Sequence, residues 1–276
     1  MSNIDPKTVA GFGDEWERFD QSALPEAESK DLFDAYFGVF PWASLPRDAH
    51  GFDLGCGTGR WARHVAQRVG HLHCIDPSSA IDVARRNLRD LDNVSFEKAD
   101  VGTTSLADGS MDFGYSLGVL HHIPDTGLAM EQCVRKLKPG APFLVYLYYR
   151  FDNRPLWFRA LWRLSDIARR GISRLPHGAR YLVSQCLAGT VYWPLARFAR
   201  AADKLGLATE GWPLAFYRDR TFYTMRTDAL DRFGTRLESR FTRTEIRNMM
   251  ERSGLRDIRF SDRPPYWCAV GLRADS

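Results

Sequence analysis

The stretch FDLGCGTGR, residues 52–60, decides the fold of this chain. A short apolar run ends in Asp53, and glycines follow at alternate positions before a helical pattern begins at Arg60. Glycine permits a sharp turn and lets a ligand approach the backbone without a Cβ in the way. The helix that follows offers its free N–H groups to a polar or anionic ligand. A dinucleotide-binding turn needs glycine where Arg60 stands, so this spacing disfavours NAD, although any tight strand-to-helix turn can have a similar sequence.

The composition of the 276 residues is that of an ordinary globular protein, with 44% hydrophobic and 26% charged residues. The five cysteines are scattered and form no C-x-x-C pair, which argues against a zinc site or a disulfide framework and fits a reducing compartment. The first residues contain no apolar run of the kind found in signal peptides. We therefore expect a cytoplasmic protein without a metal.

Positive charge is concentrated in residues 150–240. This segment holds 16 Arg and 1 Lys against 8 Asp or Glu, a local charge of +9, whereas the whole chain carries +4. Tryptophans also gather there. The shift in composition predicts a separate unit with its own role.

Acidic residues follow three of the expected strands. Asp76 ends the apolar run 71–75 and stands 23 positions after Asp53, close to the spacing at which an acid meets ribose hydroxyls in nucleotide-binding βαβ units. Its two carboxylate oxygens match two vicinal hydroxyl donors, although a helix N-cap is the alternative. Asp100 follows a third strand and is placed to accept from an adenine amine, or is a plain loop aspartate.

Five stretches follow one another in the first half of the chain: DLGCGTGRWA (53–62), CIDPS (74–78), EKAD (97–100), DFGYSLGVLHHIPD (112–125) and LKPGAPFLVYLYY (137–149). Together they resemble the successive motifs of class I S-adenosylmethionine-dependent methyltransferases, in particular the small-molecule "type 11" branch, which includes quinone and sterol methyltransferases. The alternation of strands and helices is itself typical of a doubly wound α/β sheet. The resemblance covers about residues 50–149 and, more weakly, 241–272.

The resemblance implies a mostly parallel seven-stranded, Rossmann-like sheet with a large helical insertion after the fifth strand. We expect an N-terminal helical cap in residues 1–45, a methyltransferase core in 46–149 and 241–276, and an Arg- and aromatic-rich substrate lid in 150–240. The implied cofactor is S-adenosyl-L-methionine, with S-adenosyl-L-homocysteine as product. Its expected contacts are Trp16, Asp53, Gly55, Cys56, Gly57, Asp76, Pro77, Asp100, Val101 and Leu117. Trp16 is included because a helix before the fold often covers the cofactor in this class; the alternative is that it only anchors that helix.

Methyl transfer from a sulfonium is an in-line displacement, so the main task of the enzyme is to hold a nucleophile in place. An oxygen acceptor also needs a base, and histidine is suited to that role near neutral pH. The candidate catalytic residues are His121, His122 and Tyr148, although the His-His-x-Pro sequence also occurs as family scaffolding. The candidate substrate-binding residues are Tyr149, Tyr217, Arg218, Arg220, Tyr223 and Arg226, of which the last five lie in a dense aromatic and polar stretch without a clear helical pattern.

The sequence leaves several functions open. The leading hypothesis is methyl transfer to an oxygen or nitrogen of a small molecule, with Arg218, Arg220 and Arg226 binding an anionic group on it. The alternatives are an RNA-modifying methyltransferase, a membrane-associated quinone or lipid methyltransferase, and a non-catalytic cofactor-binding protein. Residues 155–173 predict a basic amphipathic helix whose apolar stripe includes Trp157, Leu161 and Leu164. Such a stripe commonly faces a protein core, but it can also rest on a membrane surface.

Overall fold

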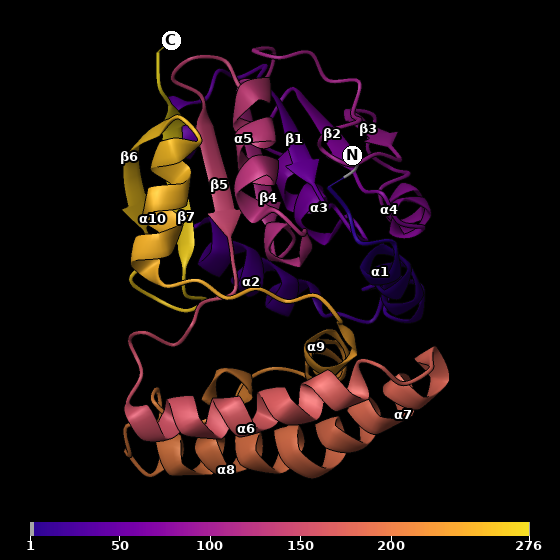
Figure 1. The fold of residues 1–276 in the computed structure, drawn as a ribbon, viewed down its shortest axis with the longest axis vertical. Helices are drawn as coiled ribbons and strands as arrows, with labels where there is room; N and C mark the ends of the chain where they lie inside the picture. Colours follow the sequence, from indigo (N-terminus) through magenta and orange to yellow (C-terminus); the bar gives the residue numbers. More distant parts are fainter. Residues whose placement is uncertain (1–2, 276) are drawn as a thin grey trace. The chain divides into compact units, whose positions relative to one another are not determined.

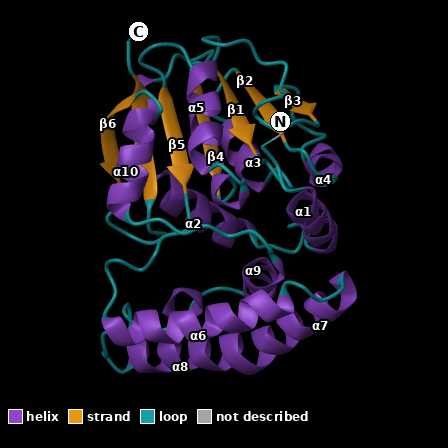
Figure 2. Cartoon of the chain, viewed as in Figure 1, coloured by secondary structure: helices purple, strands orange, loops and turns teal. Residues whose placement is uncertain are grey.

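The computed structural model describes residues 3–275, which form two compact units (Figure 2). The core unit comprises the described residues through Gln21, Ser29–Arg150 and the chain from Leu237 onward. The helical unit comprises Ser22–Glu28 and Phe151–Arg236.

The core unit is built on one seven-stranded sheet with the order β3-β2-β1-β4-β5-β7-β6. The first five strands are parallel, and β7 runs antiparallel to both of its neighbours. The predicted doubly wound seven-stranded sheet is therefore confirmed. The strands are β1 His50–Leu54, β2 His71–Ile75, β3 Val94–Glu97, β4 Phe113–Leu117, β5 Pro142–Tyr146, β6 Leu255–Phe260 and β7 Cys268–Arg273.

Helices cover both faces of this sheet (Figure 1). On one face, Met130 of α5 and Met250 of α10 pack in the main hydrophobic cluster with Phe52 and Phe143 of the strands. On the other face, Phe37 of α2 meets Tyr115 of β4, with ring centroids 5.2 Å apart. The helices of this unit are α1 Pro6–Arg18, α2 Glu26–Phe37, α3 Arg60–Ala66, α4 Ala80–Asn87, α5 Thr126–Lys136 and α10 Arg243–Arg252, with short 3₁₀ turns η1 Trp42–Ser44 and η2 Leu120–His122; the first three residues of α2 belong to the helical unit.

The helical unit packs around helix α9, Phe222–Gly234. Its core joins Met225, Ala229 and Phe233 of α9 to Tyr192 and Ala196. The remaining elements are α6 Leu156–Ile172, α7 His177–Leu187, a π-helical turn η3 Ala188–Tyr192, α8 Trp193–Lys204 and a 3₁₀ turn η4 Ala215–Tyr217. None of the described helices is both long and apolar enough to cross a membrane.

Two buried arginines of the helical unit hold the carboxyl end of α9. Arg180 donates to the carbonyl of Gly234 at 2.7 Å, and Arg169 donates to the carbonyl of Thr235 at 3.0 Å. The last carbonyls of a helix lack partners within it and carry partial negative charge, so cations are stabilising there. Part of the arginine excess of this segment is thus structural.

One local prediction differs from the structure. Tyr223 and Arg226 lie on a regular helix, α9, because Thr221 caps it by accepting from the backbone N–H of Thr224. Strand β5 ends at Tyr146, although the apolar run continues to Tyr149. Beyond that point the chain pairs with residues near Phe241 instead, through a bridge at Tyr149.

Candidate functional site

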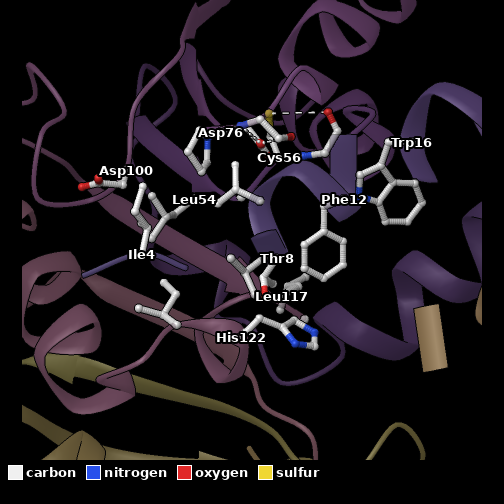
Figure 3. Close-up of a pocket in the computed structure, with 18 of the residues that line it drawn as sticks. Ile4, Thr8, Phe12, Trp16, Leu54, Cys56, Asp76, Asp100, Leu117 and His122 are labelled. Carbon is white, nitrogen blue, oxygen red and sulfur yellow. Dashed lines mark hydrogen bonds between the residues drawn. The ribbon is translucent and has the colours of Figure 1, made fainter. Parts of the chain in front are cut away.

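A cavity of about 920 Å³, open mouth included, lies at the carboxyl ends of β1, β2 and β4. Strand order reverses between β1 and β4, which is where doubly wound sheets bind ligands. Figure 3 shows Asp100 and Ile4 toward one end, and Phe12 and Trp16 toward the other. The lining residues are Ile4, Asp5, Thr8, Val9, Phe12, Trp16, Leu54–Thr58, Arg60, Trp61, Asp76–Ser78, Asp100, Val101, Leu117–Val119, His122 and Ile123.

The glycine loop after β1 forms one wall of this cavity. Gly55 has a φ of +75°, and a Cβ on it would lie 2.4 Å from a methyl group of Val119. Gly57 has a φ of +54°, and a Cβ there would stand 3.4 Å from Nε1 of Trp16 on helix α1. A side chain at position 57 would fill the space between the loop and that helix. The structure therefore brings Trp16, Gly55 and Gly57 to the same wall, as the sequence predicts.

Asp76 ties the end of β2 to this loop. Its Oδ2 accepts from the N–H of Gly57 at 3.0 Å, and its Oδ1 accepts from the N–H and the hydroxyl of Ser78 at 2.8 and 2.6 Å. The carboxylate lines the cavity although the residue is only 7% exposed. Each carboxylate oxygen has two lone pairs, so capacity remains for a ligand hydroxyl beside the loop.

Asp53 lies beneath the loop rather than on the cavity wall. It is 1% exposed and is not among the lining residues. Burial raises the pKa of Asp53 to about 8, the nearby Tyr115 phenol opposes this shift, and the charge of Asp76 adds to it. Within residues 3–275, neither Asp53 oxygen has a partner at hydrogen-bonding geometry. A direct contact between Asp53 and the cofactor is not part of this arrangement.

The wall beyond Asp76 is mainly apolar. Pro77 and Val101 line it, and Val101 also belongs to the hydrophobic cluster of the core unit. Asp100 stands half-buried at the rim, where its Oδ1 accepts from the N–H of Gly102 at 2.7 Å. An apolar slot with a carboxylate at its edge suits a flat heterocycle that carries an amine.

Several lining residues were not foreseen from the sequence. Ile4, Thr8 and Phe12 precede Trp16 on or just before α1, and the Phe12 ring packs at a tilt against His122 with ring centroids 4.9 Å apart. The spacing 8, 12, 16 is one face of a helix, which was the available signal. Val119 was also missed, because its role depends on how closely the turn after β4 approaches Gly55.

Charges around the cavity favour a cation. Three acids line it (Asp5, Asp76 and Asp100) against one arginine, Arg60. The Arg60 guanidinium lies over the Trp61 ring, 4.3 Å from its centroid. A cleft lined mostly by one sign of charge concentrates ligands of the opposite sign. A sulfonium and an ammonium group are of that sign.

The candidate catalytic residues occupy different environments. His122 lines the cavity, and its Nδ1 lies 2.6 Å from the carbonyl of Leu237. His121 points away into the interior with 0% exposure, and its ring nitrogens have no hydrogen-bond partner among the described residues. Burial lowers the pKa of His121 well below its ordinary value, so its ring is neutral. Tyr148 stacks on His121 at 3.9 Å between centroids, behind the wall.

The candidate substrate-binding residues are not among the residues that line the cavity. Tyr149 lies in the core unit against Tyr266, and its carbonyl accepts from Arg240. In the helical unit, Tyr217 donates its hydroxyl to Asp228 at 2.9 Å. Tyr223 lies on α9 with a half-buried side chain.

The three arginines predicted to bind an anion have internal partners. Arg226 donates to Oε1 of Gln185 at 2.5 Å and to the Tyr181 hydroxyl at 2.9 Å. Arg218 lies 3.5 Å from Asp219 and 3.7 Å from Asp203. The Arg220 guanidinium lies over the ring of Phe216, 5.3 Å from its centroid. A substrate role for these residues stays a prediction.

Comparison with known proteins finds relatives for the segment that provides most of the residues lining the cavity. Residues 52–145 match the model of the Methyltransf_11 family, described as a methyltransferase domain. Phosphoethanolamine N-methyltransferase 2 of Caenorhabditis elegans is 35% identical over 100 residues, which is 35% of this chain and 23% of that protein. The 27-O-demethylrifamycin SV methyltransferase of Amycolatopsis mediterranei is 33% identical over 126 residues, 44% of this chain and 45% of that protein.

A solved structure covers more of the fold. The S-adenosylmethionine-dependent methyltransferase structure from Methanosarcina mazei aligns with a TM-score of 0.51 at 18% identity, over 85% of this chain and 96% of that one. At this identity the likeness shows the fold alone. The chain spans from about a quarter to two thirds of the length of the curated relatives it matches.

These findings define residues 52–145 as a class I S-adenosylmethionine-dependent methyltransferase domain of the Methyltransf_11 family. The cofactor of this class is S-adenosylmethionine, so the predicted cofactor is confirmed for the methyltransferase domain, residues 52–145. The residues around the cavity fit this cofactor: Gly55 and Gly57 leave the loop backbone open without side chains, Asp76 provides a carboxylate, and the acids outnumber the arginine.

Proposed function

We propose that the whole protein is an S-adenosylmethionine-dependent methyltransferase that transfers the methyl group to an oxygen or nitrogen of a small molecule, with His122 as the general base. The observation that carries the role of His122 is its contact with Leu237. A carbonyl only accepts, so Nδ1 must carry the proton and donate it at 2.6 Å. In its neutral form the ring therefore has its lone pair on Nε2, a buried atom of a residue that lines the cavity.

Each part of the cavity wall has a distinct task in this proposal. Gly55 and Gly57 would hold the methionine part of the cofactor with backbone groups, Asp76 its ribose, and Pro77, Val101 and Asp100 its adenine. When bound, S-adenosylmethionine supplies an activated methyl group. The apolar side chains of Phe12 and Leu117 keep water away from the reacting atoms. His122 takes the proton of an acceptor hydroxyl or holds an acceptor amine in its neutral form.

We propose an acceptor that has no anionic group, although the arginine-rich stretch of the sequence suggested one. Arg218 and Arg226 already contact acids, an amide or a phenol within the helical unit. The cavity itself carries more acids than arginines, which disfavours an anion beside the cofactor. The relatives methylate acceptors as different as phosphoethanolamine and a rifamycin, according to their names, so they do not select one class.

Two variants of the purified protein test this proposal. His122→Asn places an amide where Nδ1 stands, so the bond to Leu237 is preserved while the base is lost. We expect binding of S-adenosylhomocysteine by calorimetry to stay within about twofold, and release of S-adenosylhomocysteine from S-adenosylmethionine with hydroxyl acceptors to fall about 100-fold or more. His50→Asn, at the exposed start of β1, is the control and should leave both unchanged.

Two results would contradict the proposal at different levels. Full turnover by His122→Asn with a hydroxyl acceptor would remove the base assignment but not the methyltransferase. Absence of binding of both S-adenosylmethionine and S-adenosylhomocysteine to the unaltered protein would remove the function itself.

A further inference from the structure

Helix α6, Leu156–Ile172, turns its apolar side outward. The side chains of Leu164 and Ile167 are 65% and 67% exposed, and Trp157 is 56% exposed. On the opposite side of the helix, Asp166 and Arg169 are each only 6% exposed and form an ion pair at 2.7 Å. A surface helix of a globular protein normally has the reverse arrangement, with its apolar stripe facing the core. The core-facing interpretation of this stripe is therefore wrong.

Other elements of the helical unit also expose large hydrophobic side chains. Of the 16 large hydrophobic side chains that are exposed among the described residues, Leu128 belongs to the core unit and the other 15 to the helical unit. They include Leu182 on α7 at 64%, and Phe198 on α8 at 63%. Leu205, directly after α8, is 80% exposed. Concentration of exposed apolar side chains in one part of a protein marks an interaction surface.

The charges on α6 indicate what this surface meets. Asp166 is the one acid of this helix, and it faces inward, where the buried Arg169 and the exposed Arg170 pair with it. Arg163 and Arg170 are both exposed and stand seven residues apart, so they follow one edge of the stripe, and the exposed Arg174 lies two residues beyond the end of the helix. The outer side of α6 thus offers leucine, isoleucine, tryptophan and arginine without an acid.

The wider charge of the unit agrees with this pattern. Residues 151–236 contain 14 Arg and 1 Lys against 7 Asp or Glu, a net charge of +8. Helices that lie in the plane of a membrane interface combine a broad apolar face with basic residues along its border and large apolar side chains at the boundary. Long arginine side chains at such a border can reach the headgroups while the helix lies at the level of the acyl chains.

We propose that α6 binds in the plane of a membrane surface that carries anionic phospholipids. Trp157, Leu161, Leu164 and Ile167 enter the boundary between headgroups and acyl chains, and Arg163, Arg170 and Arg174 contact the phosphates. The helix lies on the bilayer and does not cross it. This binding does not depend on the proposed function, because no residue of the cavity takes part.

Flotation of the purified full chain with lipid vesicles tests the proposal. We expect the protein to float with vesicles of phosphatidylcholine and phosphatidylglycerol, and to bind pure phosphatidylcholine roughly 100-fold more weakly, since three arginines lose their anionic partners. Added salt should weaken the binding to the anionic vesicles, because exposed charges are screened.

The variant Leu164→Glu/Ile167→Glu should lose vesicle binding. Both side chains are largely exposed, so the change removes the apolar stripe without opening a core, and thermal unfolding should stay within a few degrees of the original. Leu128→Glu is the matched control: it also places an acid at an exposed leucine, but in the core unit, and it should float like the unaltered protein.

Three results would overturn the proposal. The first is failure of the unaltered protein to float with the anionic vesicles. The second is undiminished flotation of the folded Leu164→Glu/Ile167→Glu variant, which would move the contact to another element. The third is assembly that grows with protein concentration in gel filtration and disappears in that variant without any vesicle binding, because the stripe would then join two copies of this chain.

Discussion

Replacement of Asp76 by asparagine tests whether one carboxylate both shapes the glycine loop and binds the cofactor. In the structure, Asp76 accepts from Gly57 through one oxygen and from the N–H and hydroxyl of Ser78 through the other. Asparagine has the same shape but a single acceptor oxygen. That oxygen can serve Gly57 or Ser78, and little capacity remains for the ribose.

The size of both effects follows from these contacts. Loss of one charge-assisted hydrogen bond of the loop should lower the free energy of unfolding by about 1–3 kcal/mol. Loss of two hydrogen bonds between a charged acceptor and ribose hydroxyls should cost on the order of 2–4 kcal/mol of binding, which is about 30- to 700-fold in affinity. The Asp76→Asn variant should therefore remain folded and bind S-adenosylhomocysteine much more weakly.

Calorimetry with S-adenosylhomocysteine and denaturant unfolding measure the two effects separately. Asp82→Asn serves as control, since this exposed aspartate of α4 pairs only with Arg85 in the described contacts and should change neither quantity by much. An Asp76→Asn protein that is less stable but binds the cofactor with unchanged affinity would refute the reasoning, because Asp76 would then be a structural cap alone.

Three further changes should act on stability. Gly55→Ala introduces a Cβ against a valine at a positive φ and should cost about 2–5 kcal/mol in denaturant unfolding, whereas Gly140→Ala, also at a positive φ but with open space around it, should cost about 1–2 kcal/mol. Burial raises the pKa of Asp53 to about 8, so the folded state binds one proton more than the unfolded state between about pH 4 and 8. The free energy of unfolding should therefore fall as pH rises through that range. The Asp53→Asn variant should show a smaller fall, and an unchanged pH profile of its stability would contradict this reasoning. Arg169→Ala leaves the buried carboxylate of Asp166 without its closest partner and should lower the free energy of unfolding by about 3–5 kcal/mol. Arg170→Ala removes a side chain that is 68% exposed and should lower it by less than about 1 kcal/mol. Equal losses of unfolding free energy in the two variants would show that burial of the ion pair does not matter.

The sheet and one wall of its cavity could be predicted because both depend on local patterns. Each parallel strand is a short apolar run, and the carboxyl ends of such strands meet at one edge. The alternate glycines and Asp76 follow two neighbouring strands, so their proximity required no knowledge of side-chain packing. The same argument predicted a position near the cofactor for Asp100, the resemblance to the methyltransferases predicted one for Leu117, and both residues line the cavity.

Other features depend on contacts that sequence spacing does not encode. His121 and His122 are adjacent in the chain, yet the 3₁₀ turn that holds them directs one ring into the core and the other to the cavity. The stripe on α6 has the periodicity of a core-facing helix, and only the buried pair of Asp166 and Arg169 shows which side faces inward. Arg226 seemed available for a ligand because its partners, Gln185 and Tyr181, lie 41 and 45 residues earlier.

Two of the chain segments that join the units, near Arg150 and Phe241, are fastened to each other. The backbone N–H of Arg150 donates to Phe241 at 2.9 Å, that of Phe241 donates to Tyr148 at 2.9 Å, and the Arg150 side chain donates to the carbonyl of Arg240. The core unit therefore closes on itself at the base of a loop of roughly 90 residues, and closing a long loop costs little more than closing a short one. Changes in the length of this loop therefore leave its fastened ends in place. A chain in which a short turn replaces residues 151–236 would keep that fastening, but the buried Glu28 of α2 would lose its 2.7 Å hydrogen bond from the Thr224 hydroxyl.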